Sequence, residues 1–162
     1  MSRVILVTGV SRDLGGRFAR VLAARGDHAV IGFDTVSPAH DLGRVQFLRG
    51  DLRSPSFPGT LVRHGVDTLV HCGLFESQLS VSPPAAKEHH VLAAMQLVAA
   101  CQQAPCFRRL VLCSTGQVYG SSPLDPARFA EDTPPGRPPR GGPGRNATEF
   151  ESLVSGLARR RP

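Results

Sequence analysis

The sequence has no tryptophan, one tyrosine (Tyr119) and one lysine (Lys87) in 162 residues. It also has no apolar stretch near the roughly 18 residues that a membrane-spanning helix needs. Residues 1–3 lead directly into a strand-like segment and do not resemble the start of a signal peptide. With 41% hydrophobic and 20% charged residues, the composition excludes a mostly disordered chain. We therefore expect a folded cytoplasmic protein without a membrane partner.

The scarcity of aromatic residues also bears on the formal net charge of +6. Arginine supplies 18 of the 19 basic side chains, and these are scattered along the chain. Residues 1–127 hold 12 basic and 9 acidic residues, an excess of 3, so the other half of the excess lies in the last 35 residues. Nucleic-acid sites usually cluster basic side chains and interleave aromatic ones that stack on bases. We therefore rank nucleic acid well below small molecules as a partner.

No Cys-x-x-Cys pair is present, although the chain has four cysteines. This absence leaves neither a zinc half-site nor a redox dithiol motif in the sequence. The histidines 89–90 near Cys101 and Cys106 would permit a metal interpretation, but reduced cysteines in apolar surroundings fit the pattern better. We expect no metal site and four structural thiols: Cys72, Cys101, Cys106 and Cys113.

Short apolar runs alternate with helical patterns over the first two-thirds of the chain, as in βαβ units with a parallel sheet. The pattern predicts strands over 3–8, 28–33, 45–48, 67–72 and 107–113. It predicts helices over 14–25 and 85–104 and a short one at most within 54–66. The first is amphipathic, with one apolar face of Leu14, Phe18, Val21 and Leu22. We predict an α/β fold, a doubly wound Rossmann-type parallel sheet of about five strands in the order 3-2-1-4-5.

The composition changes after the predicted fifth strand. Between residues 123 and 145, 11 of 23 residues are proline or glycine, which predicts an irregular loop. A helical stretch over roughly 146–158 follows, and arginines 159–161 precede the last residue. We therefore divide the chain into a nucleotide-binding domain over 1–122, a loop over 123–145 and a C-terminal helix with an arginine-rich end over 146–162.

A glycine-containing turn over residues 8–16 joins the first strand to the first helix. Backbone N–H groups and the positive end of the helix dipole at such a turn bind phosphate. Gly9 permits the tight turn, and Gly15 permits close packing near a pyrophosphate. We predict that Gly9, Ser11, Arg12 and Gly15 hold the pyrophosphate of a dinucleotide, although glycine also ends strands for purely structural reasons.

Asp34 ends the second predicted strand, 19 residues after Gly15. A dinucleotide-binding unit places a carboxylate there to accept hydrogen bonds from the adenosine ribose, and this carboxylate favours NAD over NADP because it repels a 2′-phosphate. The alternative is a loop aspartate that starts a turn. We further predict that Asp51 contacts the adenine edge and that Leu52 packs on the ring.

These segments, together with the stretch Ser-Thr-Gly-Gln-Val-Tyr-Gly at 114–120, resemble the extended short-chain dehydrogenases/reductases. The similarity is to the NAD-dependent epimerase/dehydratase group that acts on nucleotide sugars, and it covers residues 3 to about 122. It implies NAD as cofactor and a nucleotide-sugar-like substrate. It also implies that Thr115, with Ser114 as second choice, donates a hydrogen bond to the substrate oxygen. The alternative is that both hydroxyls satisfy backbone groups at a strand end.

The sequence departs from the family pattern at its catalytic positions. Arg12 and Asp13 stand where the turn would have its middle glycine, and His90 stands where a helix asparagine is usual. The family's Tyr-x-x-x-Lys is absent: its tyrosine would fall near Pro143 and its lysine near Ala147, and neither residue can transfer a proton. The chain also ends before the last strands and the substrate-binding region of such enzymes.

We therefore expect an NAD(P)-binding protein that is degenerate or truncated at its catalytic end, with weak or no turnover. One alternative is a non-catalytic regulatory or assembly protein that keeps the fold. A second, less favoured, is nucleic-acid binding through arginines 159–161. An exposed sheet edge also predicts a homo-oligomer or a partner chain. His71, at the end of the fourth predicted strand, could line the cleft, but we favour a structural role because a lone histidine at a strand end is more often structural.

Overall fold

The computed structural model describes residues 3–73, 83–120, 126, 128–134 and 143–160. Its strands are β1 (Arg3–Thr8), β2 (His28–Asp34), β3 (Gln46–Arg49), β4 (Thr68–His71) and β5 (Arg109–Leu112). They form one sheet in the order β3-β2-β1-β4-β5, and every neighbouring pair is parallel. The predicted fold class, the strand number and the strand order are confirmed.

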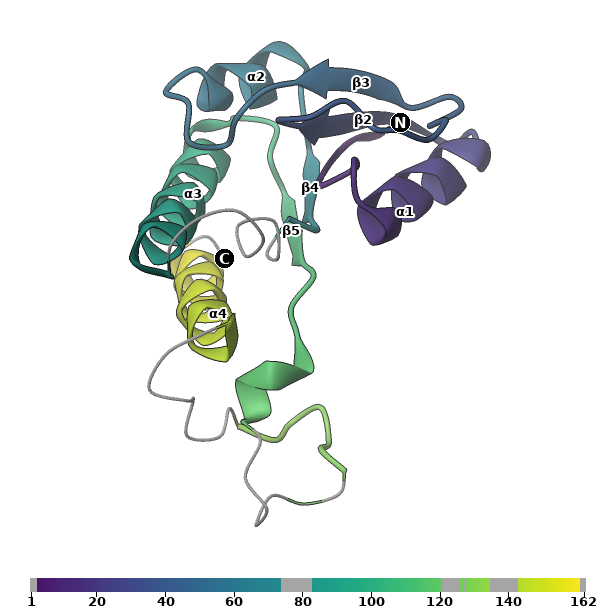
Figure 1. The fold of residues 1–162 in the computed structure, drawn as a ribbon. Coiled ribbons are helices and arrows are strands. Elements are labelled where there is room, and N and C mark those ends of the chain that lie inside the picture. The colour runs from purple at the N-terminus through teal and green to yellow at the C-terminus, as the bar shows by residue number, and fades with distance from the viewer. Residues whose placement is uncertain (1–2, 74–82, 121–125, 127, 135–142, 161–162) are drawn as a thin grey trace.

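Helices cover the two faces of this sheet unequally (Figure 1). One face carries α1 (Asp13–Ala24), and the other carries α2 (Phe57–Arg63), α3 (Pro83–Gln103) and α4 (Pro143–Arg160). The larger core lies under α2, α3 and α4, and its fully buried side chains include Leu6, Phe57, Leu69 and Leu97. The smaller core lies under α1 and is built mainly of β-branched residues, among them Ile5, Val7 and Val30.

The central strand β1 explains why both cores form. Its residues alternate between the two faces, so Leu6 enters the larger core while Ile5 and Val7 enter the smaller one. All three side chains are buried, as a continuous apolar run between two helical layers requires. Because all strands run in parallel, the residues that follow them meet at one edge of the sheet, which we call the carboxyl edge.

The apolar face predicted for the first helix is not the face that packs on the sheet. The buried residues of α1 are all small: Gly15, Gly16, Ala19 and Ala23. Leu14, Phe18 and Val21 are 63%, 42% and 60% exposed. Small side chains let the helix axis approach β1 closely, and this brings the start of α1 against the carboxyl edge.

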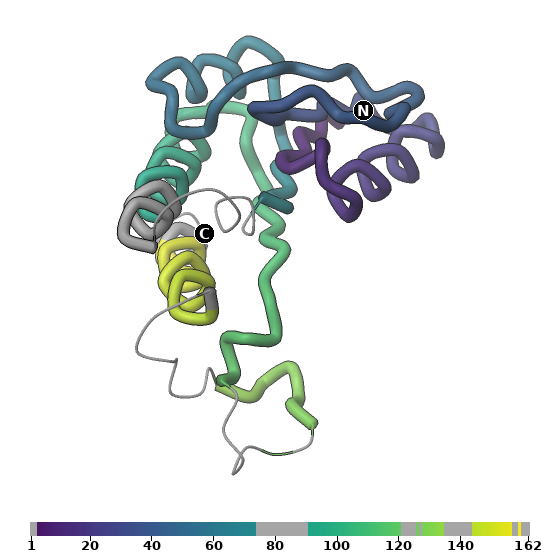
Figure 2. Tube along the Cα trace, in the orientation of Figure 1, coloured from purple at the N-terminus to yellow at the C-terminus, as the bar shows by residue number. Residues whose placement is uncertain are grey.

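After β5 the chain makes a short 3-10 helix, η2 (Gly116–Tyr119), before α4 packs beside α3 (Figure 2). Phe150 of α4 is buried in the larger core, so α4 belongs to the folded unit. It begins at Pro143, three residues before the helical stretch predicted from 146. Most of the predicted loop over 123–145 lies outside the described residues. Within the described part of the chain, no helix is long and apolar enough to cross a membrane.

Candidate functional site

The turn between β1 and α1 has a backbone that only glycine fits at its first position. Gly9 has φ +77°, and its N–H donates to the carbonyl of Phe33 at 3.1 Å. A Cβ at Gly9 would lie 2.9 Å from both the Cys72 carbonyl carbon and the Gly73 nitrogen. The turn therefore lies directly on the chain that leaves β4, as the sequence predicts for a tight phosphate-binding turn.

The start of α1 faces the same turn. A Cβ at Gly15 would lie 2.3 Å from the carbonyl oxygen of Gly9, which is a collision. Only glycine therefore lets the first turn of the helix pack this closely against the loop. The residue that precedes the helix, Arg12, provides no side-chain cap for the first amides of α1. Uncapped first-turn N–H groups beside a glycine turn form the kind of cradle that binds a phosphate group.

Asp34 joins the end of β2 to this turn. Its side chain is 5% exposed, and its Oδ2 accepts a hydrogen bond of 2.8 Å from the Ser11 N–H. Its Oδ1 accepts one of 2.7 Å from the Thr35 N–H. The Ser11 hydroxyl donates to the carbonyl of Val36, so the two segments are connected twice. The structure thus brings Gly9, Ser11 and Asp34 together, as the dinucleotide hypothesis requires.

The two side chains that replace the missing middle glycine are both exposed. Asp13 forms an ion pair with Arg17, one helical turn further along α1, with 2.9 Å between the nitrogen and the carboxylate oxygen. The negative charge expected to repel a pyrophosphate is therefore held along the outside of the helix. Arg12 leaves a positive charge at the entrance to the turn, which favours an anionic ligand.

The two residues predicted to contact adenine have other contacts in the structure. Both oxygens of Asp51 accept hydrogen bonds from the Arg53 guanidinium, the shortest at 2.6 Å. Hydrogen bonding to Asp51 raises the pKa of Arg53, against the smaller opposing effect of burial. Leu52 packs on the edge of the larger core. Their contact with adenine stays a prediction.

At the other end of the carboxyl edge, the two predicted catalytic hydroxyls differ in their partners. The Thr115 Oγ1 accepts a hydrogen bond of 3.3 Å from the Gln117 N–H and thereby caps η2. The exposed Ser114 hydroxyl donates to the carboxylate of Glu151 on α4. Capping is the structural role that the sequence left open for Thr115, and the Ser114–Glu151 pair was not predicted.

The positions expected for the family's tyrosine and lysine lie in the first turns of α4. Pro143 begins the helix, and Ala147 is 1% exposed. A Cβ at Gly144 would lie 2.5 Å from the Gln117 carbonyl oxygen, so the helix start packs tightly on η2. Glu151 follows Ala147 by four residues, on the same helix face. This spacing is the sequence signal by which Glu151 could have been found.

His71 is buried and contacts two neighbouring side chains. Its Nδ1 shares a hydrogen bond of 2.6 Å with the Thr8 hydroxyl. Its ring stacks on Phe150, with ring centroids 5.1 Å apart. These contacts agree with the structural role expected for His71, and they connect the ends of β1 and β4 to α4. The side chain of His90 lies outside the described residues.

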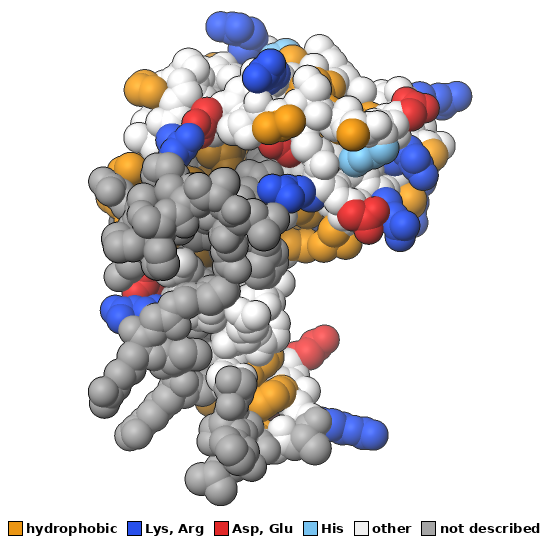
Figure 3. Space-filling view, viewed as in Figure 1, with side chains coloured by type: hydrophobic (Ala, Val, Ile, Leu, Met, Phe, Trp, Pro, Cys, Tyr) orange, Lys and Arg blue, Asp and Glu red, His pale blue; other side chains and the backbone are white. Residues whose placement is uncertain are grey.

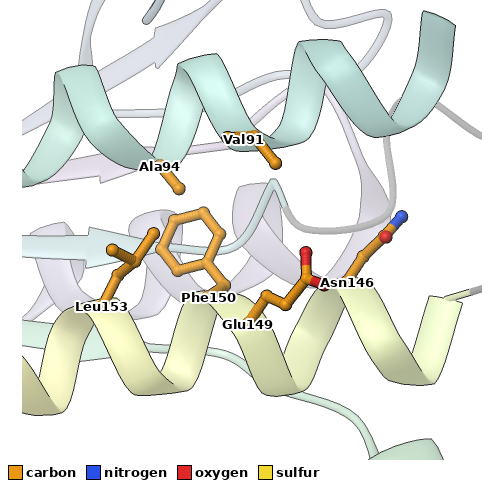
Figure 4. Close-up of a pocket in the computed structure, with 6 residues that line it drawn as sticks. All are labelled: Val91, Ala94, Asn146, Glu149, Phe150 and Leu153. Carbon is orange, nitrogen blue, oxygen red and sulfur yellow. The ribbon is translucent and has the colours of Figure 1, made fainter. Parts of the chain in front are cut away.

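A shallow groove of about 210 Å³, open to solvent, lies between α3 and α4 (Figure 4). Its lining is mostly apolar, and its two polar side chains lie toward one end. A ligand site usually has several converging polar groups, which this groove lacks. It is therefore separate from the candidate site at the carboxyl edge. Its lining residues are Val91, Ala94, Asn146, Glu149, Phe150 and Leu153.

Comparison with known proteins identifies the family. A model of the NAD dependent epimerase/dehydratase family matches residues 5–156. The chain belongs to this family. Uncharacterized proteins of Mycobacterium tuberculosis and Mycobacterium bovis are each 44% identical to it over 167 residues, a match that covers 99% of this chain and 44% of each relative. The chain thus spans less than half the length of these relatives.

Solved structures share the fold. The UDP-Glc/GlcNAc 4-epimerase of Campylobacter jejuni is 20% identical with a TM-score of 0.80, covering 99% of this chain and 50% of that one. The UDP-glucose 4-epimerase of Thermus thermophilus, solved with NAD, is 25% identical with a TM-score of 0.74, covering 96% and 51%. The dTDP-glucose 4,6-dehydratase of Bacillus anthracis, also solved with NAD, is 19% identical with a TM-score of 0.76, covering 99% and 52%.

Proposed function

We propose that this chain binds NAD at the carboxyl edge, with the pyrophosphate on the β1–α1 turn and the adenosine ribose at Asp34. The observation that carries the proposal is the hydrogen bond from the Ser11 N–H to Asp34 Oδ2. It joins the turn that would bind phosphate to the carboxylate that would bind the ribose. Gly9 and Gly15 also support the proposal. A Cβ at either position would clash with backbone atoms that pack closely around the proposed phosphate cradle.

The preference for NAD over NADP follows from the charge of Asp34. A carboxylate at this place accepts hydrogen bonds from ribose hydroxyls and repels a 2′-phosphate. Oδ1 accepts the Thr35 N–H and, over longer distances, the Thr35 hydroxyl and the Val36 N–H. Oδ2 accepts the Ser11 N–H, and because a carboxylate oxygen has two lone pairs, its second one can accept a ribose hydroxyl. The same backbone bonds fix the direction of the carboxylate before any ligand arrives, which lowers the entropy cost of binding.

The proposed partner at the nicotinamide end is a nucleotide-sugar-like small molecule. Bound NAD would supply a hydride acceptor. Thr115, or Ser114 in its place, would donate a hydrogen bond to the substrate oxygen, while no tyrosine–lysine pair is present to remove the proton. Ala147 is buried and Gly144 packs on η2. Arg145, the basic residue in the first turn of α4, forms an ion pair with Glu149 at 2.9 Å. We therefore propose weak or no turnover by this chain, in the cytoplasm, as a homo-oligomer or with a partner chain.

Isothermal titration of the 162-residue chain with NAD and with NADP tests the cofactor proposal. We expect NAD to bind more tightly than NADP. Asp34→Asn should lower NAD affinity by about 10–100-fold, because a hydrogen bond to a charged acceptor contributes about 1.5–3 kcal/mol. Asp34→Asn should also reduce or reverse the ratio of NAD affinity to NADP affinity. Asp27→Asn, which neutralises an exposed aspartate just before β2, is the matched control and should leave both affinities unchanged.

Absence of binding by NAD, NADP and their reduced forms at millimolar concentration would remove the proposal. Equal affinities of the wild-type chain for NAD and NADP would leave the cofactor assignment standing and refute the role of Asp34. Urea unfolding of both variants separates loss of binding from loss of fold.

A non-catalytic regulatory or assembly role is the second candidate function. The packing at the start of α4 favours a non-catalytic role. Ala147, near which the family's lysine would fall, is buried and has no side chain that could transfer a proton. Tight NAD binding without conversion of UDP- or dTDP-sugars would support this role. Measurable conversion of such a sugar would exclude it. Nucleic-acid binding has less support, because the Lys and Arg side chains on the face shown in Figure 3 are spread out and not gathered in one patch.

A further inference from the structure

Cys72 and Cys113 lie opposite each other at the carboxyl edge, each one residue past its strand. The last paired residues of β4 and β5 are His71 and Leu112. The ladder continues beyond them, because the Cys113 N–H donates to the His71 carbonyl at 2.9 Å. The Cys72 N–H likewise donates to the Thr8 carbonyl at 3.2 Å. The two cysteines are therefore held in strand register by backbone bonds on both strands.

Both cysteine side chains point to the same face of the sheet. Side chains alternate along a strand, so Cys72 and Cys113 share a face with the paired residues Val70 and Val111. Val70 belongs to the core under α1, and Cys72 packs against that core. Burial raises the pKa of the Cys72 thiol, and interactions with the Cys113 thiol raise it further, so the two thiols lie close together. Neighbouring strands lie about 4.8 Å apart, which falls within the roughly 4.4–6.8 Å between Cα atoms that a disulfide spans.

We propose that Cys72 and Cys113 are a redox modification site that closes to a reversible intramolecular disulfide between the ends of β4 and β5. All four cysteines are free in the structure. The Cys72 Cβ is 3.3 Å from the place of a Cβ at Gly15, so the pair borders the β1–α1 turn. The proposal stands on the two thiols alone and does not depend on NAD binding.

A low-molecular-weight disulfide such as glutathione disulfide is the oxidant that the chemistry needs. The Cys113 thiolate attacks one sulfur of glutathione disulfide, whose S–S bond breaks and releases one glutathione thiolate. Cys72 then loses its proton to solvent and attacks the Cys113 sulfur, which releases the second glutathione. The two protein thiols lose two electrons and two protons, and glutathione disulfide gains both.

The order of attack follows from the surroundings of the two sulfurs. Burial, reinforced by Cys113, raises the pKa of the Cys72 thiol to about 12. The raised pKa disfavours the Cys72 thiolate, so we assign the first attack to Cys113, which follows the exposed Val111 by two residues. The remaining cysteines are internal controls: Cys101 is 0% exposed within α3, and Cys106 is exposed but not paired with either of them.

The test is oxidation of the folded full chain with excess glutathione disulfide, alkylation of the remaining thiols with iodoacetamide after unfolding in urea at the end of the reaction, and peptide mapping by mass spectrometry. We expect a linked peptide pair that contains Cys72 and Cys113, with Cys101 alkylated and Cys106 alkylated or glutathionylated. Dithiothreitol should restore four alkylatable thiols. Cys106→Ser should leave the yield of the linked pair unchanged, and Cys113→Ser should leave Cys72 in the alkylated form.

Two results would overturn the proposal. One is a stable mixed disulfide of glutathione on Cys113 with Cys72 still alkylated, which would mean that the sulfurs do not reach each other. The other is a linkage that uses Cys101 or Cys106. As a second readout, oxidation should raise the thermal midpoint of the wild-type chain by about 5–10 °C. The double variant Cys72→Ser/Cys113→Ser should show no such rise in thermal midpoint. If the double variant does not fold, the peptide mapping of the wild-type chain alone tests whether the disulfide forms.

Discussion

The two ends of the carboxyl edge are built from different parts of the chain. At the end beside β1 and β2, the contacts are mainly backbone ones: the Gly9 turn, the amides that begin α1, and the Ser11 N–H bound to Asp34. At the end beside β5, the chemistry depends on side chains, and Ala147 and Pro143 stand where a proton-transfer pair is expected. The first end is where we propose that NAD binds, and the second is where we propose that catalysis is weak or absent.

The two ends differ in how much sequence change each can tolerate. A cradle of backbone N–H groups tolerates Arg12 and Asp13, because their side chains extend outward, Asp13 toward Arg17. A proton-transfer pair has no such tolerance, because replacing either side chain removes the reacting group itself. The fold and the cradle can therefore persist where the catalytic positions do not.

The largest effect should come from breaking the packing of α4 at the β5 end. Phe150→Ala removes a buried ring from the core and from its stack on His71, so it should lower the free energy of unfolding by about 3–5 kcal/mol. Leu153→Ala, on the same helix but 38% exposed, should cost about 1 kcal/mol or less. Urea unfolding followed by circular dichroism measures both. Equal losses would mean that α4 is not held by the Phe150 contact.

Breaking the cradle end should lower both stability and NAD binding. Gly9→Ala combines a positive φ with a clash against the Cys72 and Gly73 backbone, so we expect a loss of about 2–4 kcal/mol in stability. NAD affinity should fall at least about tenfold, since phosphate hydrogen bonds are displaced.

Gly26→Ala is the matched control for Gly9→Ala. Gly26 has nearly the same φ, +76° against +77°, but nothing lies within 4 Å of its would-be Cβ. It should cost about 1 kcal/mol and leave NAD affinity unchanged. Similar NAD affinities for the two variants in isothermal titration would contradict the assignment of the cradle to Gly9.

The smallest effect should come from the polar pair at the β5 end. Ser114→Ala removes the donor of one exposed hydrogen bond, and Glu151→Gln removes the negative charge of its acceptor, so each should change the free energy of unfolding by about 1 kcal/mol or less. Neither should change NAD affinity, because both side chains lie at the opposite end of the edge from Asp34. A tenfold loss of NAD affinity in either variant would show that the two ends are coupled.

The sequence was most informative where the local pattern of residue types permits few structures. The continuous apolar run over 3–8 predicted a central strand, and the positions of Gly9 and Asp34 predicted the meeting of turn and carboxylate. It was misleading for α1, where Leu14 and Phe18 indicated the packing face. The small residues Gly15 and Ala19 pack on the sheet instead, because the distance between helix and strand is a tertiary property.

Two side-chain pairs join residues about forty positions apart: Ser114 with Glu151, and Cys72 with Cys113. No local sequence pattern predicts either pair. By itself, the order of strand, turn and helix determined the parallel sheet, its strand order and the place of the cradle, since these follow from local periodicity and from the handedness of βαβ connections. Only the tertiary structure decided which face of α1 is buried and that α4 closes over Ala147. Both depend on how elements far apart in the chain fill space against one another.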